Sequence, residues 1–215
     1  MKPFLQRRTF FGWALSAALM SAFAVPSVQA AEESADVFIK RVSSDILEAI
    51  KADKSIRTGD ISKVITLVDQ RVMPHANFLR MTASAVGPAW RQATPEQQKR
   101  LQEEFKTLLV RTYAGALTQV NDQTIVVKPV RAAPDDKEVL VRTEVRGKGE
   151  PLQLDYRVEK TADGSDWKVY NMNVLGIWLV ENYRSQFAQE INAKGIDGLI
   201  ASLADRNKTN ARASK

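Results

Sequence analysis

Residues 166–203 read DWKVYNMNVLGIWLVENYRSQFAQEINAKGIDGLIASL, and this stretch decides the fold. Side chains in a β-strand alternate between two faces, so residues 166–174 predict a strand. One face would carry Tyr170, Met172 and Val174, and the other would carry Trp167, Val169, Asn171 and Asn173. At Gly176 the apolar spacing becomes helical, and Gly195 is expected to end this helix before a second, shorter one. The stretch therefore predicts a strand that runs directly into a helix, then a glycine stop and another helix.

Three segments before residue 166 also alternate with a period of two, at about 123–131, 138–147 and 151–160. The links between these strands contain the Pro, Asp and Gly residues of ordinary turns, at 134–136, 147–149 and 163–164. Strands joined by short links pair with their neighbours in antiparallel fashion. The sequence therefore predicts a four-stranded antiparallel sheet in up-and-down order.

The two faces of this predicted sheet differ in polarity. The second strand places Val139, Val141, Thr143 and Val145 on one face, and the third places Leu152, Leu154, Tyr156 and Val158 there. The opposite face carries charged residues, among them Glu144, Asp155 and Glu159, and is expected to face water. Helices must cover the apolar face, which predicts an α+β fold with helices on one side of the sheet.

Those helices come from the first half of the chain. Apolar residues four apart predict a helix at 36–52, and Asp60 is expected to cap a second helix that ends before Pro74. A short helix should follow from residue 75 to 87. Thr94, Pro95 and Gln97 form a capping-box pattern for a long helix to about residue 120, whose wide apolar stripe includes Leu108 and Tyr113.

The two ends of the chain are predicted to lie outside the fold. Residues 1–30 combine a basic start with an apolar run and a small-residue cleavage site, which is typical of a cleaved signal peptide. The Arg7-Arg8 pair leaves the export route open between Sec and twin-arginine translocation. We expect one α+β domain with a helical annex at 31–205 and a basic flexible tail at 206–215. Without the signal and the tail the formal charge falls from +6 to −1, so a nucleic-acid partner is not expected.

The chain offers little catalytic chemistry. It has no cysteine and a single histidine, His75, which excludes thiol nucleophiles and metal sites built from cysteine or from clustered histidines. The predicted apolar face carries no acid and no histidine, and a lone histidine without an orienting partner is more often structural. We therefore expect no catalytic residue, no metal and no cofactor. From the residue pattern alone, these apolar faces favour an ordinary solid core over a binding cavity.

Two segments and the paired strands between them resemble the MlaC family of phospholipid-binding proteins, also called the toluene-tolerance family. The first is MPHANFLRMTASAVGPAWRQATPEQQKRLQEEFKTLLVRTY at 73–113, and the second is LGIWLVENYRSQFAQEINAKGIDGLIASL at 175–203. The order of the segments also agrees with the family. Trp178 departs from its pattern, in which a small residue such as Ser is expected. The resemblance implies a curved, cone-like sheet similar to that of nuclear transport factor.

The resemblance further implies a soluble periplasmic carrier that shuttles phospholipid between the outer and inner membranes and maintains outer-membrane lipid asymmetry. Its partners would be an outer-membrane lipoprotein–porin complex and an inner-membrane ABC transporter with MCE domains, and the carrier itself would be a monomer. An enzyme or small-molecule binder on the same cone, and an adaptor without ligand, are the alternatives. The cavity would be lined by Val139, Val141, Val145, Leu152, Leu154, Tyr156, Val158, Tyr170, Met172, Val174, Leu108 and Tyr113. Its mouth would be formed by Leu175, Ile177, Leu179 and Tyr183.

Overall fold

A computed structural model describes residues 33–133 and 135–213, which fall within one compact unit of the chain. The predicted signal peptide lies outside the described residues. The helical elements are α1 (Ala35–Ala52), α2 (Lys54–Arg57), α3 (Ile61–Leu67), η1 (Val68–Val72), η2 (Met73–His75), α4 (Phe78–Val86), η3 (Gly87–Gln92), α5 (Pro95–Leu117) and α6 (Leu179–Ala213). The strands are β1 (Thr124–Val127), β2 (Glu138–Arg146), β3 (Leu152–Lys160), β4 (Trp167–Val174) and β5 (Ile177–Trp178). This α+β composition agrees with the prediction from the sequence.

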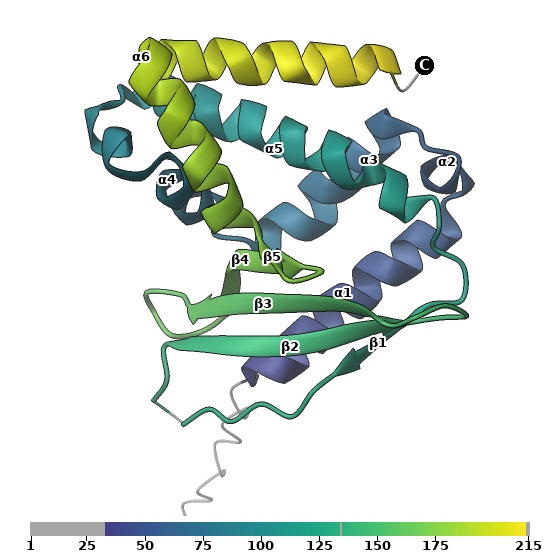
Figure 1. Ribbon diagram of the computed structural model, residues 1–215. Coiled ribbons are helices and arrows are strands. Elements are labelled where there is room, and N and C mark those ends of the chain that lie inside the picture. The colour runs from purple at the N-terminus through teal and green to yellow at the C-terminus, as the bar shows by residue number, and fades with distance from the viewer. Residues whose placement is uncertain (1–32, 134, 214–215) are drawn as a thin grey trace, which may run out of the picture. The chain divides into compact units, whose positions relative to one another are not determined.

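The strands form one antiparallel sheet in the order β1-β2-β3-β4-β5 (Figure 1). The predicted count of four strands is wrong, because the chain makes a hairpin after β4 before it enters α6. Leu175 and Gly176 form the two-residue turn with φ values of 53° and 86°. Such a turn needs positive φ at both positions and normally uses Asn, Asp or Gly. A leucine gives no sequence signal for it.

Replacing Leu175 by asparagine should stabilise the protein. A leucine with positive φ is strained, whereas asparagine tolerates this conformation through its short polar side chain. We expect the free energy of unfolding to rise by about 0.5–1 kcal/mol. Urea unfolding measures this free energy. Leu79→Asn is the control, because Leu79 is similarly exposed but lies in a helix, where its backbone is not strained. An equal change in both variants would show that the gain does not come from the turn.

A β-bulge changes which side chains of β4 share a face. Arg157 of β3 pairs with Asn171, but the next residue, Val158, pairs with Val169, so Tyr170 has no pairing partner in the ladder. The prediction that Tyr170 lies beside Met172 and Val174 is therefore wrong. Its hydroxyl donates to Glu138 on the polar face, and Arg80 lies 3.7 Å from its ring centroid. Trp167 and Val169 take the opposite, apolar face, because strict alternation fails at an extra residue.

The buried apolar side chains form three clusters among the described residues. The first joins α4, α5 and α6 around Phe105, and the second packs the start of α1 onto the sheet. The third joins the end of α1 to α2, α3 and α5. In Figure 1, α1 crosses behind the sheet, while α5 and the second half of α6 lie above it. The helix α1 thus connects the sheet to the helical layer.

The sequence correctly locates several helix boundaries. Asp60 accepts hydrogen bonds at the start of α3, and Thr94 and Gln97 form the expected capping box of α5. Gly195, with φ of 70°, interrupts α6 as expected.

The structure differs from the prediction at residue 206. Helix α6 continues to Ala213, so residues 206–213 are helical rather than a flexible tail. Arg206 pairs with Glu190, and the buried amide of Asn207 donates to the backbone and side chain of Glu104. These contacts attach the last part of α6 to the rest of the domain.

Candidate functional site

One part of the sheet's apolar face is filled by helix α1. Val141 and Val158 have no exposed surface and Val139 is 8% exposed, all in the cluster that contains Phe38 and Trp167. Tyr156 packs against the same cluster. Val139, Val141 and Val158 were predicted to line a cavity, but the structure places them in solid core under α1.

The other part of the same face is not packed in this way. Its side chains are half-buried, and none belongs to, or packs against, any of the three clusters of the described chain. They pair across the strands, Ile125 with Val145, Val145 with Leu152, and Leu154 with Val174. We call this set the unpacked strip, and it consists of Ile125, Val145, Leu152, Leu154, Met172 and Val174.

The unpacked strip has a physical consequence. Apolar side chains in the middle of a sheet normally interlock with a covering layer at crystal-like density. Where the covering layer does not pack against these side chains, dispersion energy is lost and apolar surface remains hydrated. An elongated apolar ligand on this surface would restore the dispersion contacts and remove the apolar surface from water. The strip is therefore the candidate binding surface of this protein.

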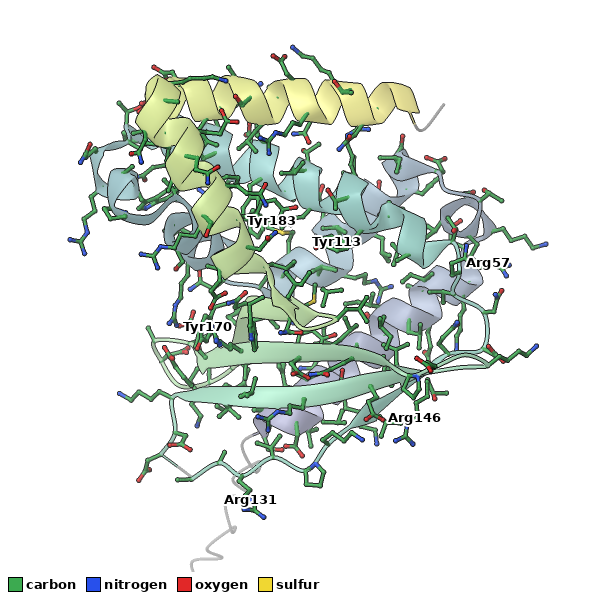
Figure 2. The ribbon with its side chains drawn as sticks, in the orientation of Figure 1. Arg57, Tyr113, Arg131, Arg146, Tyr170 and Tyr183 are labelled. Atoms are coloured by element: carbon green, nitrogen blue, oxygen red, sulfur yellow. The ribbon has the colours of Figure 1, made fainter. Side chains whose placement is uncertain are left out.

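Two tyrosines come from the helical layer. Tyr113 of α5 is half-buried and belongs to none of the three clusters, whereas Tyr183 of α6 is buried, with its ring centroid 5.0 Å from that of Phe105. Figure 2 shows both tyrosines between the helices and the sheet. Burial raises the pKa of the Tyr113 hydroxyl, and nearby Tyr183 raises it further, which keeps Tyr113 neutral. Tyr113 thus presents an uncharged, partly apolar side chain.

The remaining predicted site residues separate into two groups. Leu175 and Ile177 lie on the β4–β5 hairpin and are 66% and 54% exposed. Ile177 pairs with Val174, so it extends the face of the unpacked strip to the edge of the sheet. In contrast, Leu108, Leu179 and Tyr183 are 5%, 2% and 6% exposed. The hairpin pair can border the strip, while Leu108 and Tyr183 are buried in the cluster of α4, α5 and α6. Leu179 is buried at the start of α6.

The polar face of the sheet is partly covered by the start of α6. Asn171 accepts a hydrogen bond from the backbone of Val180 and donates to Glu181, which also pairs with Arg157. Trp178 lies over the Arg157 guanidinium at 4.0 Å. This arrangement leaves Asp155 only 5% exposed, so the prediction that Asp155 faces water is wrong. The large side chain at position 178 therefore contacts the polar face, opposite to the unpacked strip.

Sequence reasoning missed Ile125 of the strip. The segment Ile125-Val126-Val127 is apolar on both faces, so alternation does not reveal which of its side chains turn inward. The register with Val145 identifies Ile125 as the inward residue. Ile125 is therefore identified by its pairing partner in the sheet and not by a sequence motif.

Among the described residues, no side chain forms a hydrogen bond that would orient His75 as a catalytic base. Its ring packs edge-on against Phe38 at 5.8 Å, and its Nδ1 is buried without a hydrogen-bond partner. Burial lowers the pKa of His75 from its ordinary value of 6.5, and the positive charges of Arg41 and Lys168 lower it further. The side chain is therefore a neutral packing residue at pH 7.

His75→Gln should flatten the pH dependence of stability. A lowered pKa in the folded state means that the unfolded chain binds more protons, so stability is lost as the pH falls through 6.5. Urea unfolding at pH 7.5 and at pH 5.5 should show a smaller difference in the variant than in the wild type. Lipid occupancy should not change. Equal pH differences in both proteins would contradict the assignment of this effect to His75.

Within the part of the chain that is described, His, Asp and Glu side chains form no group that could hold a metal ion. In the same residues, no helix has the length and apolar character needed to cross a membrane.

Known proteins resemble the chain over most of its length. A sequence model of the MlaC protein family matches residues 40–205. The intermembrane phospholipid transport system binding protein MlaC of Haemophilus influenzae is 25% identical over 86% of this chain and 87% of its own length. The toluene tolerance protein ttg2D of Pseudomonas putida is 32% identical over 83% of this chain and 82% of its own.

A solved structure is also similar. The phospholipid-binding protein of Ralstonia solanacearum, determined in complex with a phospholipid, has 48% sequence identity and a TM-score of 0.80. The match covers 83% of this chain and 99% of that protein. Together with the family match across residues 40–205, these similarities show that the chain belongs to the MlaC family.

Proposed function

We propose that this protein is a phospholipid carrier that holds acyl chains against the unpacked strip. The strip supports the proposal because six neighbouring apolar side chains are half-buried and packed against no core cluster. The Ralstonia relative was determined with a phospholipid bound, which supports the same class of ligand. Tyr113 and Tyr156 would border the chains. Leu175 and Ile177 would lie at the mouth, where the headgroup remains in water.

The free energy available from acyl chains is sufficient for capture. A phospholipid carries on the order of 30 methylenes, and sheltering each from water contributes ~0.8 kcal/mol, about 25 kcal/mol in total before ordering costs. No catalytic group is required for this function. The unpacked strip contains no acid and no histidine, so we infer a carrier rather than an enzyme, with phospholipid as cargo and no cofactor.

The setting of this carrier is also a proposal. We infer that residues 1–30 direct export and are removed, and that the mature protein works as a monomer in the periplasm. It would move lipid between an outer-membrane lipoprotein–porin complex and an inner-membrane ABC transporter with MCE domains, and so maintain outer-membrane lipid asymmetry. The names of the relatives, which concern intermembrane phospholipid transport and toluene tolerance, support this setting. We further infer that the sheet curves into a cone similar to that of nuclear transport factor.

Solvent extraction tests the proposal. Protein purified from cells without detergent or denaturant should release phospholipid into chloroform–methanol in an amount comparable to the protein. The same preparation, unfolded, washed free of lipid and refolded, should release none and should regain lipid from vesicles. Folded protein that yields no phospholipid in either experiment would contradict the carrier function.

A further inference from the structure

A separate pocket of about 420 Å³ lies between α4, η3 and α6. It shares no lining residue with the unpacked strip. Three arginines on three different elements line it, Arg80 of α4, Arg91 of η3 and Arg184 of α6. The rest of the lining consists of Ala83, Ser84, Gly87, Pro88 and Trp90. The pocket is thus basic and contains no carboxylate in its lining.

The three arginines differ in whether a carboxylate compensates their charge. Arg80 pairs with Glu138 at 2.8 Å and with Glu159, so its charge is compensated from the polar face of the sheet. Arg91 and Arg184 are exposed and form no ion pair with any of the residues that the structure describes. Two uncompensated cations at one small pocket repel each other unless an anion lies between them.

Arg184 lies close to Gly87 at the end of α4. A Cβ atom at residue 87 would come within 3.6 Å of Nε of Arg184, and the φ of +72° suits glycine. The Arg184 side chain therefore lies beside the α4–η3 junction and is also exposed to solvent. Arg184 and the residues of η3 reach the same pocket from elements about 90 positions apart in the sequence.

We propose that this pocket binds a phosphate ester, with Arg91 and Arg184 as the anion-binding side chains. Guanidinium groups match the oxygens of phosphate with paired hydrogen bonds, and the Ser84 hydroxyl offers a further donor. The pocket is larger than a phosphate ion, so it accommodates the phosphate together with a small group such as glycerol, beside the Trp90 ring. The same chemistry is found in a free phosphate metabolite and in a lipid headgroup at a membrane surface. This site goes beyond the proposed carrier function, because it can be occupied whether or not acyl chains are held.

Titration calorimetry at low ionic strength tests the site with two probes, sn-glycerol 3-phosphate and vesicles of phosphatidylglycerol, with phosphatidylcholine vesicles as reference. The variant is Arg91→Gln with Arg184→Gln in the full mature protein. The matched control is Arg131→Gln, an exposed arginine on the link between β1 and β2, which lies away from α4 and α6 in Figure 2. Circular dichroism confirms folding, and Arg91→Gln alone serves if the double variant does not fold.

We expect glycerol 3-phosphate to bind the wild type and Arg131→Gln with equal affinity. The affinity of the double variant should be lower by about tenfold or more, since two charge-assisted contacts are lost. If only phosphatidylglycerol vesicles bind, with the same dependence on the two arginines, the phosphate belongs to a lipid headgroup. Absence of binding of both probes to the wild type, or equal binding to the double variant, would overturn the proposal. The amount of phospholipid recovered by solvent extraction does not depend on the outcome of this calorimetry. Failure of the phosphate site and failure of the carrier function can therefore be distinguished.

Discussion

Leu154→Asp should remove bound phospholipid from the protein and leave the fold intact. Leu154 is half-buried in the middle of the unpacked strip and packs against no core cluster, so water can reach a carboxylate there once the lipid has left. With acyl chains present, the same carboxylate would be buried without a partner, which costs more than about 1.4 kcal/mol. Occupancy should therefore fall by about tenfold or more. Lipid extraction and thermal unfolding, measured on the same preparation, give both quantities.

Leu140→Asp is the matched control for this variant. Leu140 lies in the neighbouring strand on the opposite face of the sheet and is 37% exposed. The same substitution there should leave both lipid content and thermal stability near the wild-type values. If Leu154→Asp unfolds, the strip is part of a solid core. If it folds and keeps its lipid, the acyl chains lie elsewhere.

Phe105→Ala should have the largest effect on stability. Phe105 has no exposed surface, and its ring centroid lies 5.7 Å from Phe78, 5.0 Å from Tyr183 and 5.2 Å from Phe187. It therefore joins α4, α5 and α6, and its removal leaves a cavity that the surrounding rings cannot close. A buried Phe→Ala change typically lowers the free energy of unfolding by about 3–5 kcal/mol. Urea unfolding monitored by circular dichroism measures this loss.

Phe105→Leu should lose much less, because it keeps most of the buried volume. A loss below about 1 kcal/mol for Phe105→Ala would contradict the assignment of this residue to the centre of the helical core.

The central strands could be predicted because their alternation is regular. The valines at 139, 141 and 145 of β2 pair with Val158, Tyr156 and Leu152 of β3, as the two-residue period indicates. The start of α5 could also be predicted, since a capping box is a local signal that does not depend on the rest of the fold. Both features are determined by residues close to one another in the sequence or by a strict period.

The end of the sheet could not be predicted, for two local reasons. An extra residue in β4 reverses the faces on either side of Tyr170, and no turn or glycine in the sequence indicates this bulge. The β4–β5 turn contains Leu175 in a conformation that leucine seldom adopts. Both features depend on how neighbouring strands pair, and the sequence of a single strand does not determine that pairing.

The candidate site could be predicted only in part. Val141 and Leu154 are both apolar and both on the inner face, yet one has no exposed surface and the other is half-buried. The difference depends on where α1 crosses the sheet, since its buried side chains cover only one part of that face. Alternation identifies the face, but only the three-dimensional packing separates core from unpacked strip.

The most direct test of the central claim is the relaxation of methionine methyl groups by a spin-labelled lipid. Protein with ¹³C-labelled methionine methyls would be loaded with a phospholipid that carries a nitroxide in one acyl chain. Met172 lies in the unpacked strip, whereas Met81 is buried in the cluster of α4, α5 and α6. We predict that the Met172 resonance broadens most and the Met81 resonance much less. Broadening of Met81 that equals or exceeds that of Met172, with the lipid demonstrably bound, would contradict the proposed position of the acyl chains.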